Sequence, residues 1–491
     1  MQVAPWHEVT AGILFLAAYA LIASEKVDKT KVALIGAGLM ILLGIVSQHE
    51  AFGETERVVH SLNEFAEEYE PPDAVGDAAL AHESAPSAEE VERAAAVIER
   101  SGLAEVPGVD WNTIFLLVGM MIFVGITSRT GVFEWVAIKS ARLAKGRPIV
   151  ILCLLCVVTA VLSAFLDNVT TVLLIGPVTI LVAEALALDP IPMLIAEALA
   201  SNIGGTATLI GDPPNILIGS RAGFAFNDFL INLGPLVLVL LALYVVYLTI
   251  FWRRDMTTTD ARRERLMEMD ASKAIRSKPL LVRSGVVGAM ILTGFVLHNR
   301  LGMEPATIAL SGAALLLLVS GLKVEEAFES IEWSTIFFFI GLFIMVGGLV
   351  KVGLIERLSR IVLAEFGDNT SVLAIVVLWF SAVASAVVDN IPYVATMCPL
   401  VNDVATQLTG EPALEAARDP AIFPIWWSLS LGACLGGNGT LVGASANVVM
   451  CGLSKRQGHP ISFMRFARAG LPVMLWTVAL STLYVWVRYL R

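Results

Sequence analysis

Two short polar stretches lie inside long apolar segments of this sequence. Asp167 and Asn168 stand side by side in the first, and Asp389 and Asn390 stand side by side 222 residues further along. A charged Asp in the middle of a bilayer costs roughly 2.5–3.5 kcal/mol on insertion scales. Because the sequence carries this costly pair in two corresponding positions, we expect the pair to bind a cation or a proton.

The composition indicates a protein that crosses a membrane many times. The chain has 491 residues, of which 56% are hydrophobic and 16% charged, whereas soluble domains carry about 25% charged residues. Several apolar runs approach the roughly 20 residues that span a bilayer. The sequence contains neither a basic domain nor a motif for nucleic-acid binding. We predict an all-α polytopic membrane protein whose partners are the lipid bilayer and a small inorganic ion or small anion.

The residue types that serve enzymes and metal centres form no recognisable constellation in the sequence. Cys153 and Cys156 have redox-motif spacing, but they lie in a continuous helical run, where we expect them to pack as small hydrophobic side chains. None of the six histidines pairs with another at ligand spacing. We therefore expect no enzyme, no metal centre and no cofactor, apart from Na⁺ that the polar stretches could bind.

The two polar stretches belong to an internal repeat. Residues 111–119 match 333–341, again 222 positions apart. Each half carries five apolar spans and one re-entrant hairpin, at 149–187 in the first half and 372–404 in the second. Because five is odd, the second half must be upside down, which predicts inverted-topology repeats, a recurring plan of secondary transporters. The two hairpins would then enter the membrane from opposite sides.

The repeat divides the chain into parts with different charge. We expect two transmembrane helices in 1–48, an acidic insertion with a short capped helix (87–98) in 49–110, the rest of the first repeat in 111–252, a basic loop in 253–283 and the second repeat in 284–491. The positive-inside rule places the basic loop and the lysines of 26–31 in the cytoplasm. The N-terminus and 49–110 of a cell-membrane protein would then face outside. The main exceptions to the rule are Lys351, Arg357 and Arg360.

Glycine-rich breaks interrupt one apolar span in each half, at 204–215 and 436–447. Broken helices in a membrane persist only where they line a cavity or pack against protein, and they indicate a binding site near the midplane. Helix N-termini favour anions, whereas freed carbonyls and the oxygens of Asn and Thr favour Na⁺. The candidate ion- or substrate-binding residues are Asp167, Asn168, Thr170, Thr206, Asp212, Asn215, Asp389, Asn390, Asn438, Thr440 and Asn447, with Glu197, Ser201 and Asn202 as secondary candidates.

Asp212 makes the two halves chemically unequal, because Ala444 stands at the corresponding position of the second half. A carboxyl group that is removed from water binds a proton more readily, so we expect ion coupling at Asp212 first. Structural alternatives remain open. The Asp–Asn pairs could cap the second helix of each hairpin, the glycines could permit close helix packing, and Glu197 could form an interhelical hydrogen bond.

These motifs resemble an ion transporter superfamily that holds arsenite permeases, NhaD-type sodium/proton antiporters and citrate-transporter-like proteins, and within it the melanosomal P protein and its prokaryotic relatives. The resemblance rests on 163–171, 210–215, 389–392 and 432–449, and it covers the chain apart from about 53–108. It implies a scaffold domain, a mobile transport domain, elevator-type movement and a homodimer.

The resemblance also bears on the choice of substrate. Related divalent-anion/sodium symporters carry Ser-Asn-Thr at their hairpin tips, whereas this chain has Asp167 and Asp389 in place of Ser, and Pro392 in place of the second Thr. Extra negative charge disfavours a dicarboxylate. We therefore expect a secondary active transporter, of the cation/proton (Na⁺/H⁺) antiport kind. A proton- or sodium-coupled transporter of an organic acid, arsenite or chloride is the alternative, and a channel or membrane scaffold is a third.

Overall fold

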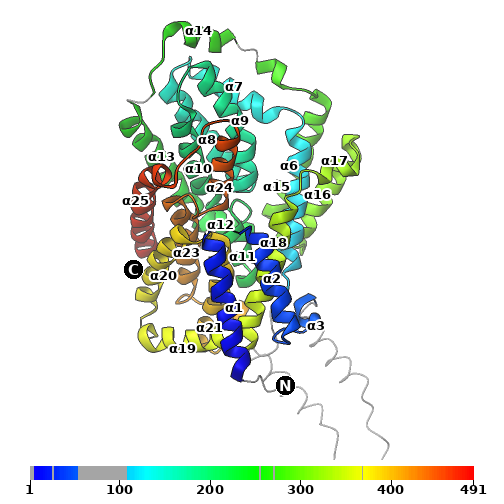
Figure 1. Ribbon diagram of the computed structural model, residues 1–491, viewed down its shortest axis with the longest axis vertical. Helices are drawn as coiled ribbons and strands as arrows, with labels where there is room; N and C mark the ends of the chain where they lie inside the picture. The colour runs from blue at the N-terminus through cyan, green and yellow to red at the C-terminus, as the bar shows by residue number, and fades with distance from the viewer. Residues whose placement is uncertain (1–4, 25–26, 53–107, 254–255, 269–270, 368) are drawn as a thin grey trace, which may run out of the picture.

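The computed structural model describes residues 5–24, 27–52, 108–253, 256–268, 271–367 and 369–491, which fold into helices joined by loops (Figure 1). The helix predicted at 87–98 lies outside these residues. Eight of the described helices are long and apolar enough to cross a membrane. They are α6 (Trp111–Ser128), α8 (Pro148–Phe165), α9 (Asn168–Ala185), α13 (Gly234–Phe251), α15 (Lys278–Leu301), α18 (Trp333–Lys351), α20 (Thr370–Val387) and α25 (Phe463–Tyr489). The chain is thus a membrane protein that is all-helical over the described residues.

Other helices of the described residues complete the two halves. They are α1 (Pro5–Ser24), α2 (Lys29–Leu42), α3 (Gln48–Phe52), α7 (Val132–Leu143), α10 (Pro190–Gly205), α11 (Pro213–Ala222), α12 (Phe226–Asn232), α14 (Asp260–Glu268), η2 (Ala271–Ala274), α16 (Pro305–Ser320), α17 (Val324–Phe328), α19 (Leu354–Phe366), α21 (Asn390–Thr409), α22 (Ala413–Ala416), α23 (Phe423–Gly436), η3 (Gly437–Gly439) and α24 (Ser445–Arg456).

The apolar segment 226–251 is divided into α12 and α13. Pro235 stands at the start of α13, where a proline, which lacks an N–H, is tolerated in the first turn but would break a continuous helix. The basic stretch 253–283 is not all loop, because it contains α14 and η2 and the first turn of α15.

The two predicted hairpins lie at opposite ends of the molecule. Figure 1 shows α7, α8 and α9 in the upper half and α19, α20 and α21 in the lower half. Each hairpin turns at its Asp–Asn pair, between α8 and α9 at Asp167 and between α20 and α21 at Asp389. Helix α14 from the basic stretch lies at the upper end, and α1 begins at the lower end (Figure 1).

The repeated glycines allow equivalent helices to approach closely. A Cβ atom added at Gly119 of α6 would lie 2.7 Å from the backbone of Ala309 on α16, and one added at Gly341 of α18 would lie 2.7 Å from the backbone of Ala33 on α2. Contacts under 3.0 Å require the neighbour to move. The motif shared by 111–119 and 333–341 therefore serves the same helix crossing twice.

The broken helices pack against both hairpins. Within each half, the first hairpin helix packs on the helix before the break, as α8 on α10 and α20 on α23. The second hairpin helix packs across the halves, as α9 on α24 and α21 on α11. The glycine at each break permits the first contact, because a Cβ at Gly204 would meet the Ala160 carbonyl oxygen at 2.1 Å and one at Gly436 the Ala382 carbonyl oxygen at 2.5 Å. Close packing is thus one role of these glycines.

Candidate functional site

The two hairpin tips meet at Asp212, which lies in the first break immediately before α11 and is fully buried. The Asn168 side-chain amide donates to Asp212 Oδ1 at 3.0 Å, and the Asn390 amide donates to the same oxygen at 3.4 Å. The structure therefore brings together three of the predicted residues, from both halves of the chain, around one carboxyl group.

Two oxygen atoms at this point have no hydrogen-bond partner among the described residues, Asp212 Oδ2 and Asn168 Oδ1. No Lys, Arg or His of the described ranges forms an ion pair with Asp212. A buried carboxylate without a positive partner is costly. Its charge must therefore be neutralised by a proton or by a bound cation, for which oxygen atoms are suitable ligands.

Asn202 links this centre to the second half. Its Oδ1 accepts a hydrogen bond from the Asn168 amide at 3.2 Å. Its own amide donates to Asn438 Oδ1 at 3.0 Å and Asn447 Oδ1 at 3.1 Å. The Asn438 amide nitrogen has no partner in the described part of the chain. Asn202, a secondary candidate from sequence, thus lies at the crossing point of a buried network formed by Asn168, Asn202, Asn390, Asn438, Asn447 and Asp212, here called the amide network.

Asn215 and Asn447 hold the two breaks open in the same way. The Asn215 amide donates to the carbonyl of Thr208, and the Asn447 amide donates to the carbonyl of Thr440, each at 2.9 Å. Ser430 donates to the remaining Asn215 oxygen at 2.6 Å. These side chains thus replace helical hydrogen bonds that the breaks remove. Asn215 lies in this supporting position, outside the amide network.

Three predicted hydroxyl groups are bound to backbone carbonyls. Thr206 donates to Asn202 at 2.7 Å, Thr440 to Ala386 at 2.6 Å and Ser201 to Asn168 at 3.2 Å. Because each hydroxyl proton already has an acceptor, these groups support the break and the tips. They do not donate to Asp212.

The tip carboxyl groups act as helix caps. Asp167 accepts from the Thr170 amide at 2.8 Å and from the Thr170 hydroxyl. Asp389 accepts from the amide of Ile391 at 3.2 Å. The capping interpretation therefore describes the geometry of both aspartates, which are 6% and 8% exposed.

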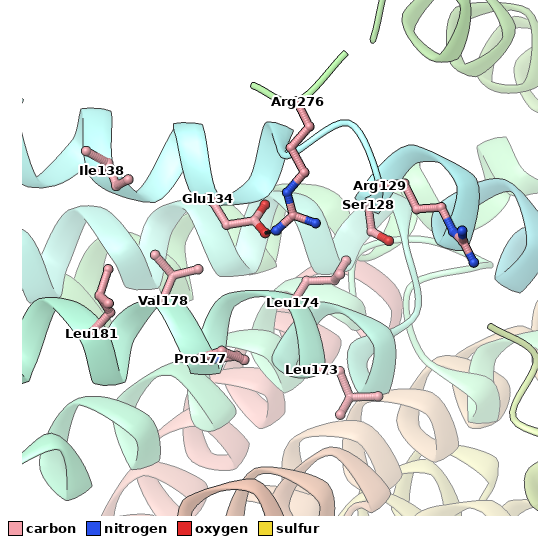
Figure 2. A pocket seen from close by; sticks show the side chains of 10 residues that line it. All are labelled: Ser128, Arg129, Glu134, Ile138, Leu173, Leu174, Pro177, Val178, Leu181 and Arg276. Atoms are coloured by element: carbon pink, nitrogen blue, oxygen red, sulfur yellow. Dashed lines mark hydrogen bonds and ion pairs between the residues drawn. The ribbon is translucent and has the colours of Figure 1, made fainter. Parts of the chain in front are cut away.

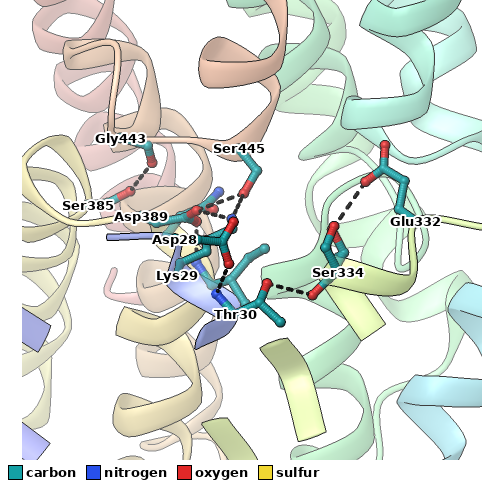
Figure 3. A network of polar contacts seen from close by, with 12 residues as sticks. Asp28, Lys29, Thr30, Glu332, Ser334, Ser385, Asp389, Gly443 and Ser445 are labelled. Atoms are coloured by element: carbon teal, nitrogen blue, oxygen red, sulfur yellow. Dashed lines mark hydrogen bonds and ion pairs between the residues drawn. The ribbon is translucent and has the colours of Figure 1, made fainter. Parts of the chain in front are cut away.

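Asp389 has a further partner that the sequence reasoning missed. Figure 3 shows the Lys29 ammonium beside it, with Nζ 2.8 Å from Asp389 Oδ2. The Ser445 hydroxyl donates to the same oxygen at 2.7 Å. Lys29 was expected in a loop of cytoplasmic lysines, but it is the first residue of α2. A cation at a helix N-terminus is disfavoured by the helix dipole, and this is the signal that could have singled it out.

Glu197 lies in a different place. It is fully buried on α10 and accepts a hydrogen bond from the Thr179 hydroxyl of α9 at 2.6 Å. The interhelical hydrogen bond, which the sequence left open as an alternative to a transport role, is therefore present, and none of the described hydrogen bonds connects Glu197 to the amide network.

An open cavity of about 440 Å³ lies beside α9, away from the amide network (Figure 2). It is lined by apolar side chains around Pro177 and by the Glu134–Arg276 ion pair at 3.1 Å. None of the residues of the amide network lines this cavity.

Comparison with known proteins gives the family. The model of the citrate transporter family, CitMHS, matches residues 90–432. An uncharacterized transporter of Mycobacterium tuberculosis is 43% identical over 482 residues, covering 98% of each chain. The human P protein is 34% identical over 466 residues, covering 78% of this chain, which spans about half (54%) of that protein.

A solved structure agrees at the level of the fold. The crystal structure of the Alcanivorax borkumensis YdaH transporter covers 93% of this chain and 98% of its own, with a TM-score of 0.54 and 14% sequence identity. The match shows a similar helical arrangement. Together, the family model and the full-length relatives show that this chain is a membrane transporter, not an enzyme, and that it belongs to the citrate transporter (CitMHS) family.

Proposed function

We propose that this chain is a secondary active transporter that exchanges a cation of the Na⁺ kind for protons. The observation that carries the proposal is Asp212, buried between Asn168 and Asn390 with one oxygen unpartnered and no positive neighbour among the described residues. One carboxyl group can be neutralised by a proton or by a metal cation, but not by both at once. Competition for a single site is the simplest physical basis of exchange.

We propose that the amide network binds the ion and that the hairpin tips close the binding site. Asp167, Thr170 and Asp389 would order the tips around the ion, while Thr206, Asn215, Thr440 and Ser201 would keep the breaks rigid. Glu197 would hold α9 against α10. This division follows the hydrogen bonds that each side chain makes.

We further propose that the chain consists of two inverted repeats, with five spans and a re-entrant hairpin each, divided as the sequence indicates at 49–110 and 253–283. Three features support the proposal. The hairpins lie at opposite ends of the molecule (Figure 1), equivalent helices cross at Gly119 and Gly341, and the second helix of each hairpin packs on the broken helix of the other half. An elevator-type movement of the hairpins in a homodimer follows from the family resemblance.

The orientation we propose places 253–283 in the cytoplasm and the N-terminus outside a cell membrane. The three basic residues that break the positive-inside rule are each paired with a carboxylate. Lys351 lies 2.7 Å from Glu50 and Arg357 lies 3.1 Å from Glu8, while Arg360 pairs with Glu356. These ion pairs stabilise the charges locally, but the positive-inside rule counts Lys and Arg alone, so the three residues remain exceptions to the proposed topology.

A coupled anion transporter is the second candidate. The Asn438 amide is a buried donor without a partner in the described residues, and the helices after both breaks begin near the amide network. Donors and helix N-termini suit a carboxylate. An anion such as citrate would then be carried together with the ion at Asp212.

The test uses purified protein in liposomes that contain a pH-sensitive dye. We expect an imposed Na⁺ gradient to drive proton movement in the wild type, and Asp212→Asn to reduce the rate by at least about tenfold, because an amide cannot exchange a proton for a cation. Glu184→Gln, a change at an exposed carboxylate, is the matched control. Full flux in Asp212→Asn would contradict the proposal. Flux that requires added citrate, arsenite or chloride would select the second candidate.

A further inference from the structure

The two hairpin tips are alike in sequence but unequal in charge. Asp389 lies 2.8 Å from the Lys29 ammonium, whereas none of the ion pairs among the described residues involves Asp167. The first tip is thus open to an added cation, and the second already holds one that is supplied by the chain itself.

Three groups position the Lys29 ammonium. Nζ donates to Asp389 Oδ2 and, at 2.7 Å, to the Ser445 hydroxyl. It also lies 4.9 Å from the ring centre of Phe338, within the range of a cation–π contact. The side chain of Lys29 is 31% exposed, so water and small ions can reach the pair. The ammonium is therefore held in a defined place without being sealed in.

The position of Lys29 in the repeat makes the lysine informative. The counterpart of α2 is α16, which begins at Pro305, 276 residues after Lys29, the same offset that relates Ala51 to Ala327. Asp28 and Glu304 are the residues before the two helices, and both are acidic. The lysine is thus an addition to one half only, at a place where the helix dipole disfavours it. Its contact with the tip offsets that cost.

Lys29 connects a helix pair of the first half to the hairpin of the second. Helix α1 reinforces the connection, since the Tyr19 hydroxyl donates to the Pro392 carbonyl and lies 2.6 Å from the Thr396 hydroxyl. Both contacts fall within one turn or two of the Asp389 tip. A movement of this tip relative to α1 and α2 must therefore break the ion pair.

We propose that Lys29 is a built-in cation of the second tip, which occupies the place of an alkali cation at Asp389 and must leave before such a cation binds there. The inference rests on the proposed cation transport, because an ion has to reach the tips. It gives the two half-sites different roles. The transported ion binds at Asp212. The oxygens of Asp389 and Ser445 form a second site, for which Lys29 and an alkali cation compete. Displacement of Lys29 from this site releases the tip from α2.

The experiment compares thermal unfolding of the purified full-length protein in NaCl and in choline chloride of equal concentration. We expect Lys29→Met to gain Na⁺-dependent stabilisation, with an apparent Na⁺ affinity raised by at least about tenfold over wild type, since a competitor has been removed. The gain must disappear in Lys29→Met/Asp389→Asn. Lys29→Arg, which keeps the charge, and Lys31→Met, which removes an exposed lysine two residues away, should both behave like wild type.

A second variant allows the lysine charge to be removed and restored in one sample, so that differences in folding between protein preparations do not affect the comparison. Lys29→Cys places a thiol at this partly exposed position, while the five native cysteines are buried. Modification with 2-aminoethyl methanethiosulfonate restores an ammonium in the same sample. We expect the unmodified protein to show the Na⁺ gain and the modified protein to lose it.

The outcomes separate this inference from the proposed function. The inference is overturned if Na⁺ stabilises Lys29→Met no more than wild type, or if the gain survives Asp389→Asn. The proposed exchange is judged by wild-type proton flux in liposomes, which does not involve these variants. If the wild type shows no proton flux but Na⁺ stabilises Lys29→Met more than wild type, the proposed exchange is wrong and the second site is supported.

Discussion

Asn168 and Asn390 occupy the same position in the two halves of the chain, and their side-chain amides donate to one oxygen, Oδ1 of Asp212, at 3.0 and 3.4 Å. The two amides come from hairpins at opposite ends of the molecule (Figure 1). Asp212, which has no counterpart in the second half because Ala444 stands there, is thus also the residue at which the two halves meet. Because both tips donate to Asp212, binding of a proton or a cation at this carboxyl group changes the hydrogen bonds of both tips.

The unequal distances predict unequal effects of removing the two amides. We expect Asn168→Ala to lower the free energy of unfolding by about 1–3 kcal/mol, because it removes the shorter of the two hydrogen bonds to Asp212 Oδ1 and the hydrogen bond to Asn202 Oδ1. Asn390→Ala should cost less. Thermal unfolding in detergent measures both, with Asn227→Ala at an exposed hydrogen bond as the control. A larger loss in Asn390→Ala would mean that the second tip, rather than the first, supports Asp212.

The close approach at the second break predicts a strong dependence on glycine. A methyl group at Gly436 would lie 2.5 Å from the carbonyl oxygen of Ala382, which belongs to backbone and cannot give way. We expect Gly436→Ala to prevent correct folding, seen as loss of the monodisperse peak in size-exclusion chromatography. Gly452 lies on α24 with open space around it, so Gly452→Ala should be neutral or stabilising by up to about 1 kcal/mol. Equal behaviour of the two variants would contradict the packing argument.

The contacts of Glu197 predict a structural role. Glu197→Gln keeps an acceptor for the Thr179 hydroxyl and removes the charge, so we expect Na⁺-driven proton flux within about twofold of wild type. Thr179→Val should instead destabilise the protein by about 1 kcal/mol, since it removes the donor. Loss of flux in Glu197→Gln at unchanged thermal stability would show that this carboxyl group takes part in transport.

The pair between Glu50 and Lys351 predicts a pH-dependent contribution to stability outside the membrane spans. Partial burial would raise the pKa of Glu50, but hydrogen bonds from Lys351 and Ser47 outweigh it and hold the pKa below its usual value. A lowered folded-state pKa means that the stabilisation is present at neutral pH and is lost as the pH falls through that pKa. We expect Glu50→Gln to cost about 0.5 kcal/mol at neutral pH, with the difference from wild type vanishing in acid.

The control for this pair is the cycle with Lys351→Met. If the ion pair is the cause, the double variant should lose no more stability than either single variant. Additive losses, or a difference between wild type and Glu50→Gln that persists at low pH, would assign the effect to packing of α3.

The sequence by itself determined the class of the protein and the positions of its unusual residues. Long apolar runs require helices in a membrane, because only a helix satisfies its own backbone there. The repeat located the Asp–Asn tips and the breaks, which the structure places within α8–α9, α20–α21 and the two interrupted helices. Local rules also gave capping by Asp167 and Asp389 as an open alternative, since capping depends on residues only a few positions apart, and the structure shows both caps.

Only the tertiary structure decided which of these residues meet. The convergence of Asn168 and Asn390 on Asp212, the bridge through Asn202 and the supporting position of Asn215 depend on how the helices of the two halves cross. Lys29 is the clearest case. Its partner Asp389 lies 360 residues further along the chain, so the unfavourable position of Lys29 at a helix N-terminus could mark the lysine as unusual but could not identify its partner. Contacts between distant segments follow from packing of whole helices, which local composition does not specify.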